Sequence, residues 1–329
     1  MRDLNRALLA RQFLLQRQPI PVERVIEHLG GLQAQQSRPP FTGLWSRIEG
    51  FEADQLRSLL SSRQVVRATT LRGTLHIHTR ADYHAWRPML QPMLTSGAQS
   101  ILKARLHTFD HARILDYARE CFDRGPRGFN TLREELVAQF PDGDERAMGY
   151  FVRMHLPLAS VPDDDNVFEH VTTVEPDTGY MNGLITRYLG AFGPATIADF
   201  QTWSGLKGAK SSFEAMDLLT FEDDKRRILH DLPDALRPSP DTPVPVRLIA
   251  EFDNLVLGHA DRRRIVSDEY RARIVTKNLL VSGTFLMDGF VAGTWKRDGK
   301  QVKLETFEPL APKVMKAVEA EAGRLQAFH

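Results

Sequence analysis

Cysteine is nearly absent from this sequence of 329 residues: Cys121 is the single one, which excludes an internal disulfide. A chain without disulfides fits a reducing compartment. Long apolar runs are also missing, since no stretch approaches the roughly 18 consecutive apolar residues that span a membrane. The beginning, MRDLNRALLARQFLL, lacks an apolar core followed by a small-residue cleavage site. We therefore expect a cytoplasmic protein that does not associate with membranes.

An excess of charge of either sign is lacking too. Lys plus Arg number 43 and Asp plus Glu number 42, so the net charge is +1. This balance excludes a protein that coats nucleic acid through its overall field, and any DNA binding needs a local basic patch. The sequence also lacks a P-loop, a GxGxxG after a strand, and a nucleophile elbow. These absences argue against a nucleotide-dependent enzyme and a serine hydrolase.

Metal ligands are sparse as well. His76 and His78 share one face of the predicted strand TLHIH and could ligate a metal, but no carboxylate or cysteine nearby completes a set. We therefore predict no metal and no cofactor. A polar strand face toward DNA phosphate would make His76 a DNA contact, and an exposed strand without such a role is the alternative.

The length suits two or three domains, and the hydrophobic pattern divides the chain into four segments. In residues 1–80, helices are predicted over LNRALLARQFLLQ, IPVERVIEHLGG and ADQLRSLLSS. The stretch VVRATTLRGTLHIHT follows as a β-hairpin that turns near Arg72 and Gly73. Helices followed by a two-stranded wing are typical of a winged helix, a variant of the helix-turn-helix.

Residues 81–178 repeat this pattern. A long helical stretch begins at 81, and Pro88 and Pro92 must start, kink or interrupt it. A helix over FNTLREELVAQF has Asn130 or Thr131 as its predicted N-cap. A strand pair around NVFEHVTTVE completes a second winged helix.

Residues 179–243 hold a third set of helices, over GLITRYLGAF, GPATIADFQTWSGL and AKSSFEAMDLL. Thr196 is the predicted N-cap of the second helix, Asp199 occupies the capping-box position, and Gly205 ends it. The three units share a pattern of elements and little sequence identity. We predict a third winged helix here.

Residues 244–329 are rich in predicted strands. The stretches FLMDGFVAGTW and WKRDGKQVKLETF each place an Asp-Gly pair between alternating residues, which is a strong signal for a hairpin. A meander or a small β-barrel is expected, followed by an amphipathic helix over APKVMKAVEAEAGRLQAF. The predicted fold class is therefore α+β.

Several segments together resemble one family. LGGLQAQ, GTLHIHT, GPATIADFQTWSGL, EFDNLVLGHADRR and DGFVAGTWKRDGKQVKLETFEPL are similar, in this order, to the AlkZ-like bacterial winged-helix DNA glycosylases, which unhook interstrand crosslinks. The resemblance spans nearly the whole chain. It implies three tandem winged helices and a C-terminal β-barrel in a C shape around DNA. It also implies a catalytic motif of Gln, an apolar residue and Gln, which corresponds here to Gln33, Ala34 and Gln35.

Glutamine does not titrate, so its use in a glycosylase needs a chemical reason. No Asp or Glu occurs between Glu27 and Glu49. A base alkylated at a ring nitrogen is already cationic and leaves as a neutral molecule, so the oxocarbenium-like transition state needs no general acid. Side chains two apart in extended backbone project to the same side, so Gln33 and Gln35 could hold one water between them. Gln36 would point away, and a solvated loop is the alternative interpretation.

Basic side chains supply candidate phosphate contacts. The stretch HADRRRIVSDEYRARIVTKN has a local excess of basic residues, and Arg262, Arg263 and Arg264 are its leading candidates. Arg38 and Arg72 could contact phosphates around the glutamines. A solvated charged face is the alternative for the set.

These inferences combine into a monofunctional DNA glycosylase, a monomer that excises bulky or crosslinked N-alkylated purines of the N7-alkylguanine type from double-stranded DNA. Two alternatives stay open. One is a non-catalytic winged-helix DNA-binding protein, either a regulator or an architectural module. The other is a resistance protein that binds a DNA-alkylating compound. A regulator reads half-sites at a fixed spacing, whereas a glycosylase releases free base with little dependence on sequence.

Overall fold

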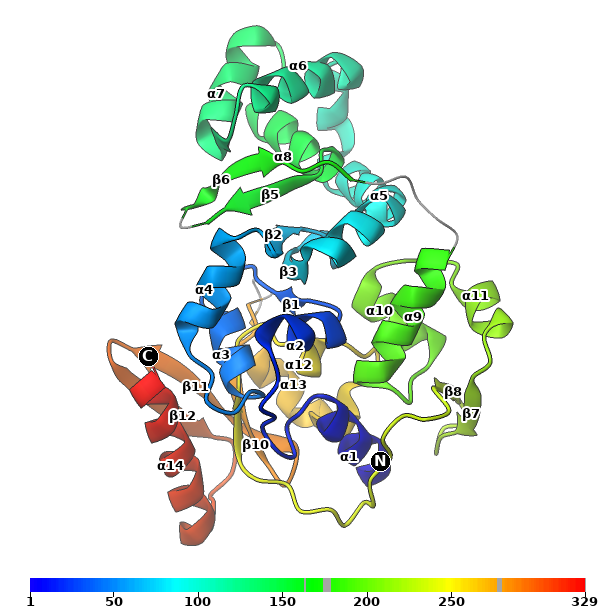
Figure 1. Cartoon of the computed structure of the whole chain (residues 1–329), viewed down its shortest axis with the longest axis vertical. Helices are drawn as coiled ribbons and strands as arrows, with labels where there is room; N and C mark the ends of the chain where they lie inside the picture. The colour runs from blue at the N-terminus through cyan, green and yellow to red at the C-terminus, as the bar shows by residue number, and fades with distance from the viewer. Residues whose placement is uncertain (163, 174–178, 277–279, 329) are drawn as a thin grey trace.

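The computed structural model of the chain describes residues 1–162, 164–173, 179–276 and 280–328. It combines helices with open sheets, and one order of elements recurs three times (Figure 1). That order is a helix, a short strand or bridge, two helices and a two-stranded hairpin. The helix α1 (Arg2–Arg11) precedes the first of these repeats.

The first repeat comprises α2 (Val22–His28), β1 (Leu32–Gln33), α3 (Pro39–Trp45), α4 (Ala53–Ser61), β2 (Val65–Thr69) and β3 (Leu75–Thr79). After the long helix α5 (Arg80–Leu102), the second comprises α6 (His111–Asp123), β4 (Arg127–Gly128), α7 (Phe129–Gln139), α8 (Glu145–His155), β5 (Leu158–Val161) and β6 (Asp164–His170). The third comprises α9 (Gly179–Phe192), α10 (Ile197–Ser204), α11 (Lys210–Ala215), β7 (Leu219–Glu222) and β8 (Ile228–Asp231). In the third repeat, Ala195 bridges to His230 in place of the short strand.

The C-terminal segment forms an open antiparallel sheet in the order β12-β11-β10-β9. It comprises β9 (Arg247–Ile249), α12 (Asn254–Leu257), α13 (Asp268–Ile274), β10 (Gly283–Met287), β11 (Phe290–Asp298), β12 (Gln301–Thr306) and α14 (Pro312–Phe328). Both predicted Asp-Gly hairpins are present, the first with Asp288 at φ 47° and Gly289 at φ 86°. The meander is confirmed and the barrel is wrong, because β9 and β12 are each paired on one side only within the described residues.

The first two repeats share one sheet, which the sequence did not predict. Its order is β1-β3-β2-β5-β6-β4, and the two hairpins join where Ala68 of β2 pairs with Ala159 of β5. One large hydrophobic core unites the first repeat, the third repeat and the C-terminal sheet, while α6, α7 and α8 enclose a core of their own. The helices of the second repeat therefore lie at one end of the molecule (Figure 1).

Several local predictions are corrected. The helix α5 contains both Pro88 and Pro92 without interruption, because its buried face packs against the core and offsets the lost hydrogen bonds. The helix α7 begins at Phe129 after Gly128, ahead of the caps predicted at 130 and 131. The strand pair predicted around NVFEHVTTVE is present, with β6 covering the first half of the stretch and its partner β5 lying upstream of it. The last two residues of that stretch, and the predicted boundary at 178, lie outside the described residues.

Candidate active site around Gln33

A pair of glycines lets the chain turn into the glutamine segment. Gly30 and Gly31 have φ values of +64° and +96°, a region that L side chains rarely adopt. A Cβ on Gly30 would lie 2.7 Å from the ring of Trp203, and a Cβ on Gly31 would overlap the ring of His78. This turn brings β1 alongside β3, where Gln33 pairs with His76.

Gln33 is half-buried, and its amide oxygen is held by an arginine from the turn of the first hairpin. Arg72 Nη2 donates to Gln33 Oε1 at 2.8 Å and to Asn254 Oδ1 at 2.9 Å. Arg72 Nη1 donates to the carbonyl oxygen of Trp203 in α10. Burial, with a smaller contribution from Arg262, lowers the pKa of the Arg72 guanidinium to about 10, so it stays charged at neutral pH. Because these donors face internal acceptors, the geometry argues against the predicted phosphate contact.

Gln35 and Gln36 are exposed and follow the end of β1. Gln35 Oε1 accepts from the backbone N–H of Leu75 at 3.3 Å, and the N–H of Ala34 donates to the Leu75 carbonyl at 2.7 Å. Gln33 and Gln35 therefore bind different partners in this structure, one in the interior and one along the edge of β3. That their amides hold one water stays a prediction.

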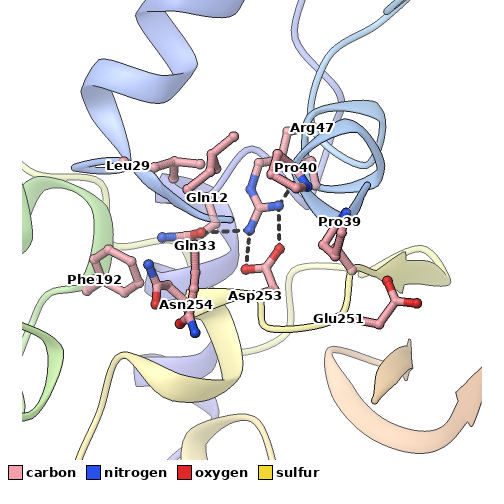
Figure 2. Close-up of a pocket in the computed structure, with 14 residues that line it drawn as sticks. Gln12, Leu29, Gln33, Pro39, Pro40, Arg47, Phe192, Glu251, Asp253 and Asn254 are labelled. Carbon is pink, nitrogen blue, oxygen red and sulfur yellow. Dashed lines mark hydrogen bonds and ion pairs between the residues drawn. The ribbon is translucent and has the colours of Figure 1, made fainter. Parts of the chain in front are cut away.

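A small cavity lies beside Gln33 (Figure 2). The space open to the centre of a water molecule is about 20 Å³, which has room for roughly one water. Two carboxylates that the sequence did not connect with Gln33, those of Glu251 and Asp253, also line it. The Arg47 guanidinium donates to both oxygens of Asp253, at 2.8 and 2.9 Å, and balances its charge. The Glu251 carboxylate points away from Gln33, beside Pro39 (Figure 2), and burial raises its pKa.

Two histidines of β3, His76 and His78, are fully buried. His76 Nδ1 lies 3.1 Å from the Thr74 carbonyl oxygen and Nε2 lies 3.4 Å from Arg72 Nη2, so Nδ1 donates and Nε2 accepts. Burial, followed by the charge of Arg72, lowers the pKa of His76 well below its usual value. The predicted phosphate contact of His76 is wrong, because a neutral imidazole enclosed on all sides cannot meet DNA.

The three arginines of the basic segment differ in their surroundings. Arg264 is buried and its Nη1 donates to the Pro194 carbonyl at 2.8 Å, so its predicted phosphate contact is wrong. Arg263 pairs with the carboxylate of Asp261 at 2.7 Å. Arg262 is half-buried, and its Nε has no hydrogen-bond partner in the described part of the chain. Of the three, Arg264 is the one enclosed in the interior, whereas Arg262 and Arg263 are half-buried.

Arg38 is exposed and belongs to a basic cluster that the sequence alone did not reveal. Together with Arg57 of α4 and Arg297 of β11, it lines a surface cavity of about 280 Å³. The rings of Phe41 and Phe328 line the same cavity. Arg57 is paired with Asp54 at 2.7 Å, but both side chains are exposed and such a surface pair is weak, so the three guanidinium groups still favour an anion such as a phosphate.

Metal binding and membrane insertion are the two remaining possibilities. Within the described residues, no three side chains of His, Cys, Asp or Glu gather closely enough to hold a metal ion. No helix in the same part of the chain is both long and apolar enough to cross a membrane.

Comparison with known proteins places the chain among the DNA glycosylases. The family described as DNA glycosylase AlkZ-like matches residues 26–328, and the chain belongs to this family. A curated relative from Streptomyces sahachiroi, the Interstrand DNA cross-link repair glycosylase, is 24% identical over an alignment 360 residues long. This alignment covers 96% of this chain and 92% of the relative. The solved structure of Streptomyces sahachiroi DNA glycosylase AlkZ has the same fold, with a TM-score of 0.82 at 22% identity over 99% of this chain and 96% of that one.

Proposed function

We propose that this protein is a monofunctional DNA glycosylase that excises bulky or crosslinked N-alkylated purines, of the N7-alkylguanine type, from double-stranded DNA. It acts as a monomer in this proposal. The observation that carries it is the Gln33 site, where amide side chains, one charge-balanced carboxylate and a water-sized cavity meet in a chain of the AlkZ-like family.

The chemistry of the site suits a leaving group that is already cationic. Such a base departs as a neutral molecule once the glycosidic bond breaks, so the enzyme has to stabilise an oxocarbenium-like sugar and supply water. Asp253 shares its charge with Arg47, and the Glu251 carboxylate points away from Gln33, so neither is placed beside it as a general acid. Positioned dipoles are then the means of catalysis.

In this proposal Gln33 and Gln35 position the attacking water. The Gln33 carbonyl oxygen uses one lone pair for Arg72 and keeps a second that can accept from water. The adjacent cavity holds about one water in reserve. Gln35 lies on the exposed side of the same segment, where the sugar of a bound nucleotide would approach.

The three repeats serve as winged-helix units whose concave face, C-shaped overall, holds the duplex. The cavity lined by Arg38, Arg57 and Arg297 provides phosphate contacts on that face, and the half-buried Arg262 is a further candidate. The proposed DNA-binding set is therefore Arg38, Arg57, Arg262 and Arg297, in place of the whole basic segment.

An open site explains why bulky adducts are the proposed substrates. Enzymes that flip a base into a closed pocket exclude large or crosslinked lesions. Gln35, Gln36 and Arg38 are all exposed, so this segment offers no such closed pocket to a base. The name of the curated relative refers to interstrand crosslinks, which supports the same substrate class here.

Product analysis tests the proposal. The protein is incubated with a duplex that carries one N7-alkylguanine, and with the unmodified duplex as control. We expect free alkylated base and an intact abasic strand from the first duplex alone, because the cavity beside Gln33 is lined by no lysine that could attack the sugar. A covalent adduct trapped by borohydride would contradict the monofunctional mechanism. Tight DNA binding without base release would support the non-catalytic alternative.

A further inference from the structure

Arg72 occupies an unusual place in the fold. It lies in the turn between β2 and β3 with φ 56°, a left-handed conformation that side chains other than glycine seldom adopt. Its guanidinium joins the first repeat to the two other parts of the molecule that surround Gln33. The acceptors are Gln33 Oε1 of β1, the Trp203 carbonyl at the end of α10, and Asn254 Oδ1 at the start of α12.

Among the residues that the structure describes, no acidic side chain forms an ion pair with this guanidinium. In the described part of the chain its hydrogen-bond acceptors are carbonyl oxygens and, more distantly, the His76 ring. The charged side chain that acts on it most is Arg262, which has the same sign. A half-buried cation without a carboxylate partner among the described residues gains no ion pair to offset its lost hydration, so its contacts with the three carbonyl oxygens are what hold it in place.

The effect on Gln33 follows from the geometry. An amide side chain on a short edge strand can rotate and exchange its oxygen and nitrogen ends. A charged donor at 2.8 Å fixes the oxygen, so the amide nitrogen must face the opposite side. The Gln33 side chain is thereby ordered during folding, so its loss of conformational entropy does not fall on the substrate-binding step.

The backbone of Arg72 also packs closely against the third repeat. Gly205, the residue that ends α10, has φ +81°, and a Cβ there would lie 3.1 Å from Arg72 Cα and 3.2 Å from its backbone nitrogen. The third repeat thus contacts Arg72 directly, and the Trp203 carbonyl in the same helix end accepts from its side chain.

We propose that Arg72 is a positioning residue for base excision. It fixes the orientation of the Gln33 amide by donating a hydrogen bond to its oxygen, and it makes no contact with DNA phosphate. This inference rests on the proposed function, because it requires Gln33 to take part in excision. Arg72 acts through Gln33, with Asn254 as the partner that aligns the guanidinium plane.

Arg72→Lys and Arg72→Ala test this role. A lysine ammonium lacks the planar fork that serves three acceptors, so both variants should lower the single-turnover excision rate, by about 10² for alanine. The DNA dissociation constant and its salt dependence should stay at the parent values. Millimolar guanidinium ion added to Arg72→Ala should restore part of the rate, a rescue that a purely structural defect does not allow.

Arg63→Ala is the matched control. Arg63 lies in the same repeat, also has a positive φ of 60°, and binds Glu169 in place of an amide near the site. Its replacement should leave the excision rate unchanged. Melting temperatures of all variants establish that they are folded, and Arg72→Lys alone decides the question if Arg72→Ala does not fold.

The outcomes separate this inference from the proposed function. If Gln33→Ala abolishes excision while Arg72→Lys and Arg72→Ala keep the parent rate, the positioning role is overturned and the glycosylase proposal stands. If the Arg72 variants lose DNA affinity and flatten its salt dependence, Arg72 is a phosphate contact and the inference is wrong. If folded Gln33→Ala excises at the parent rate, the glycosylase mechanism itself fails. A Gln33→Ala, Arg72→Ala double variant should be no slower than Gln33→Ala, since the two residues act as a unit.

Discussion

His78 shows at the scale of one residue how the interior behind Gln33 is built. Its Nε2 lies 2.8 Å from Thr70 Oγ1, its ring meets Trp86 edge-on at 5.6 Å between centroids, and it is fully buried. Burial lowers the pKa of His78 to about 3, so the ring is neutral at every pH near 7. His76, beside it, is neutral for the same reason.

These histidines predict how stability varies with pH. Below about pH 6.5 the unfolded chain binds protons that the folded chain excludes, so the free energy of unfolding should fall as pH is lowered from 7 toward 4. Each histidine contributes up to about 1.4 kcal/mol per pH unit. Asp82 opposes this below pH 6, because burial raises its pKa to about 6 and the folded state then takes up the proton first.

Chemical denaturation at several pH values measures how steeply the free energy of unfolding changes with pH, and this is the slope compared here. His78→Gln keeps a nitrogen that can meet Thr70 and removes the titrating ring, so its slope should be shallower than the parent slope. Equal slopes for the two proteins would show that His78 does not titrate on unfolding.

At this scale the family resemblance pointed to the segment that lies beside the small cavity, and the sequence misjudged the surroundings of several side chains near it. Alternation along TLHIH placed His76 and His78 on one face, but it could not show that both faces of β3 are covered. Gln33 was predicted as a catalytic residue through the family resemblance, and that role stays a prediction. Arg72 was predicted as a phosphate contact near the glutamines. The carbonyl oxygens that occupy it belong to residues about 130 and 180 positions away, which a local reading of the sequence does not reach.

At the scale of elements, local chemistry made much of the fold predictable. Thr196 and Asp199 form the predicted capping box of α10, and Gly205 ends that helix in the left-handed conformation. The hairpin turns and the end of α2 were predicted from their glycines and Asp-Gly pairs. A positive φ restricts the choice of residue to a few, so these residues mark turns in the sequence.

Elements that depend on distant partners could not be predicted in this way. β1 and β4 have two residues each, too few for any periodicity, and they exist because β3 and β6 offer a free edge. The junction of the two hairpins rests on one pair of alanines, Ala68 and Ala159, and no sequence pattern marks it. The site depends on β1, so its geometry was beyond the reach of local patterns.

At the scale of the whole molecule, some arginines are buried in interior contacts and others line a surface cavity. Arg264 and Arg47 are buried in internal contacts, although both come from segments that looked basic or site-related in sequence. Arg38, Arg57 and Arg297 are distant in sequence and meet around one cavity. Net charge and local runs therefore gave an incomplete guide to where arginines gather on the surface.

The salt dependence of DNA affinity distinguishes arginines that contact phosphate from arginines engaged in internal contacts. Replacing Arg38, Arg57 and Arg297 together with alanine should reduce the slope of log affinity against log salt by up to about 2.7, since each phosphate contact contributes about 0.9. Arg263→Ala is the control, because that side chain is engaged by Asp261, and its slope should equal the parent slope. A triple variant with the parent slope would remove the cluster from the DNA-binding face.

The single-turnover rate at which N7-alkylguanine is released tests the central claim most directly. Gln33→Ala and Gln35→Ala should each lower this rate by about 10² to 10³, with DNA affinity nearly unchanged. The double variant should be little slower than the worse single variant, and Gln36→Ala should retain the parent rate. If folded Gln33→Ala and Gln35→Ala proteins release the base as fast as the parent, the glutamines are not the catalytic groups and the account is contradicted.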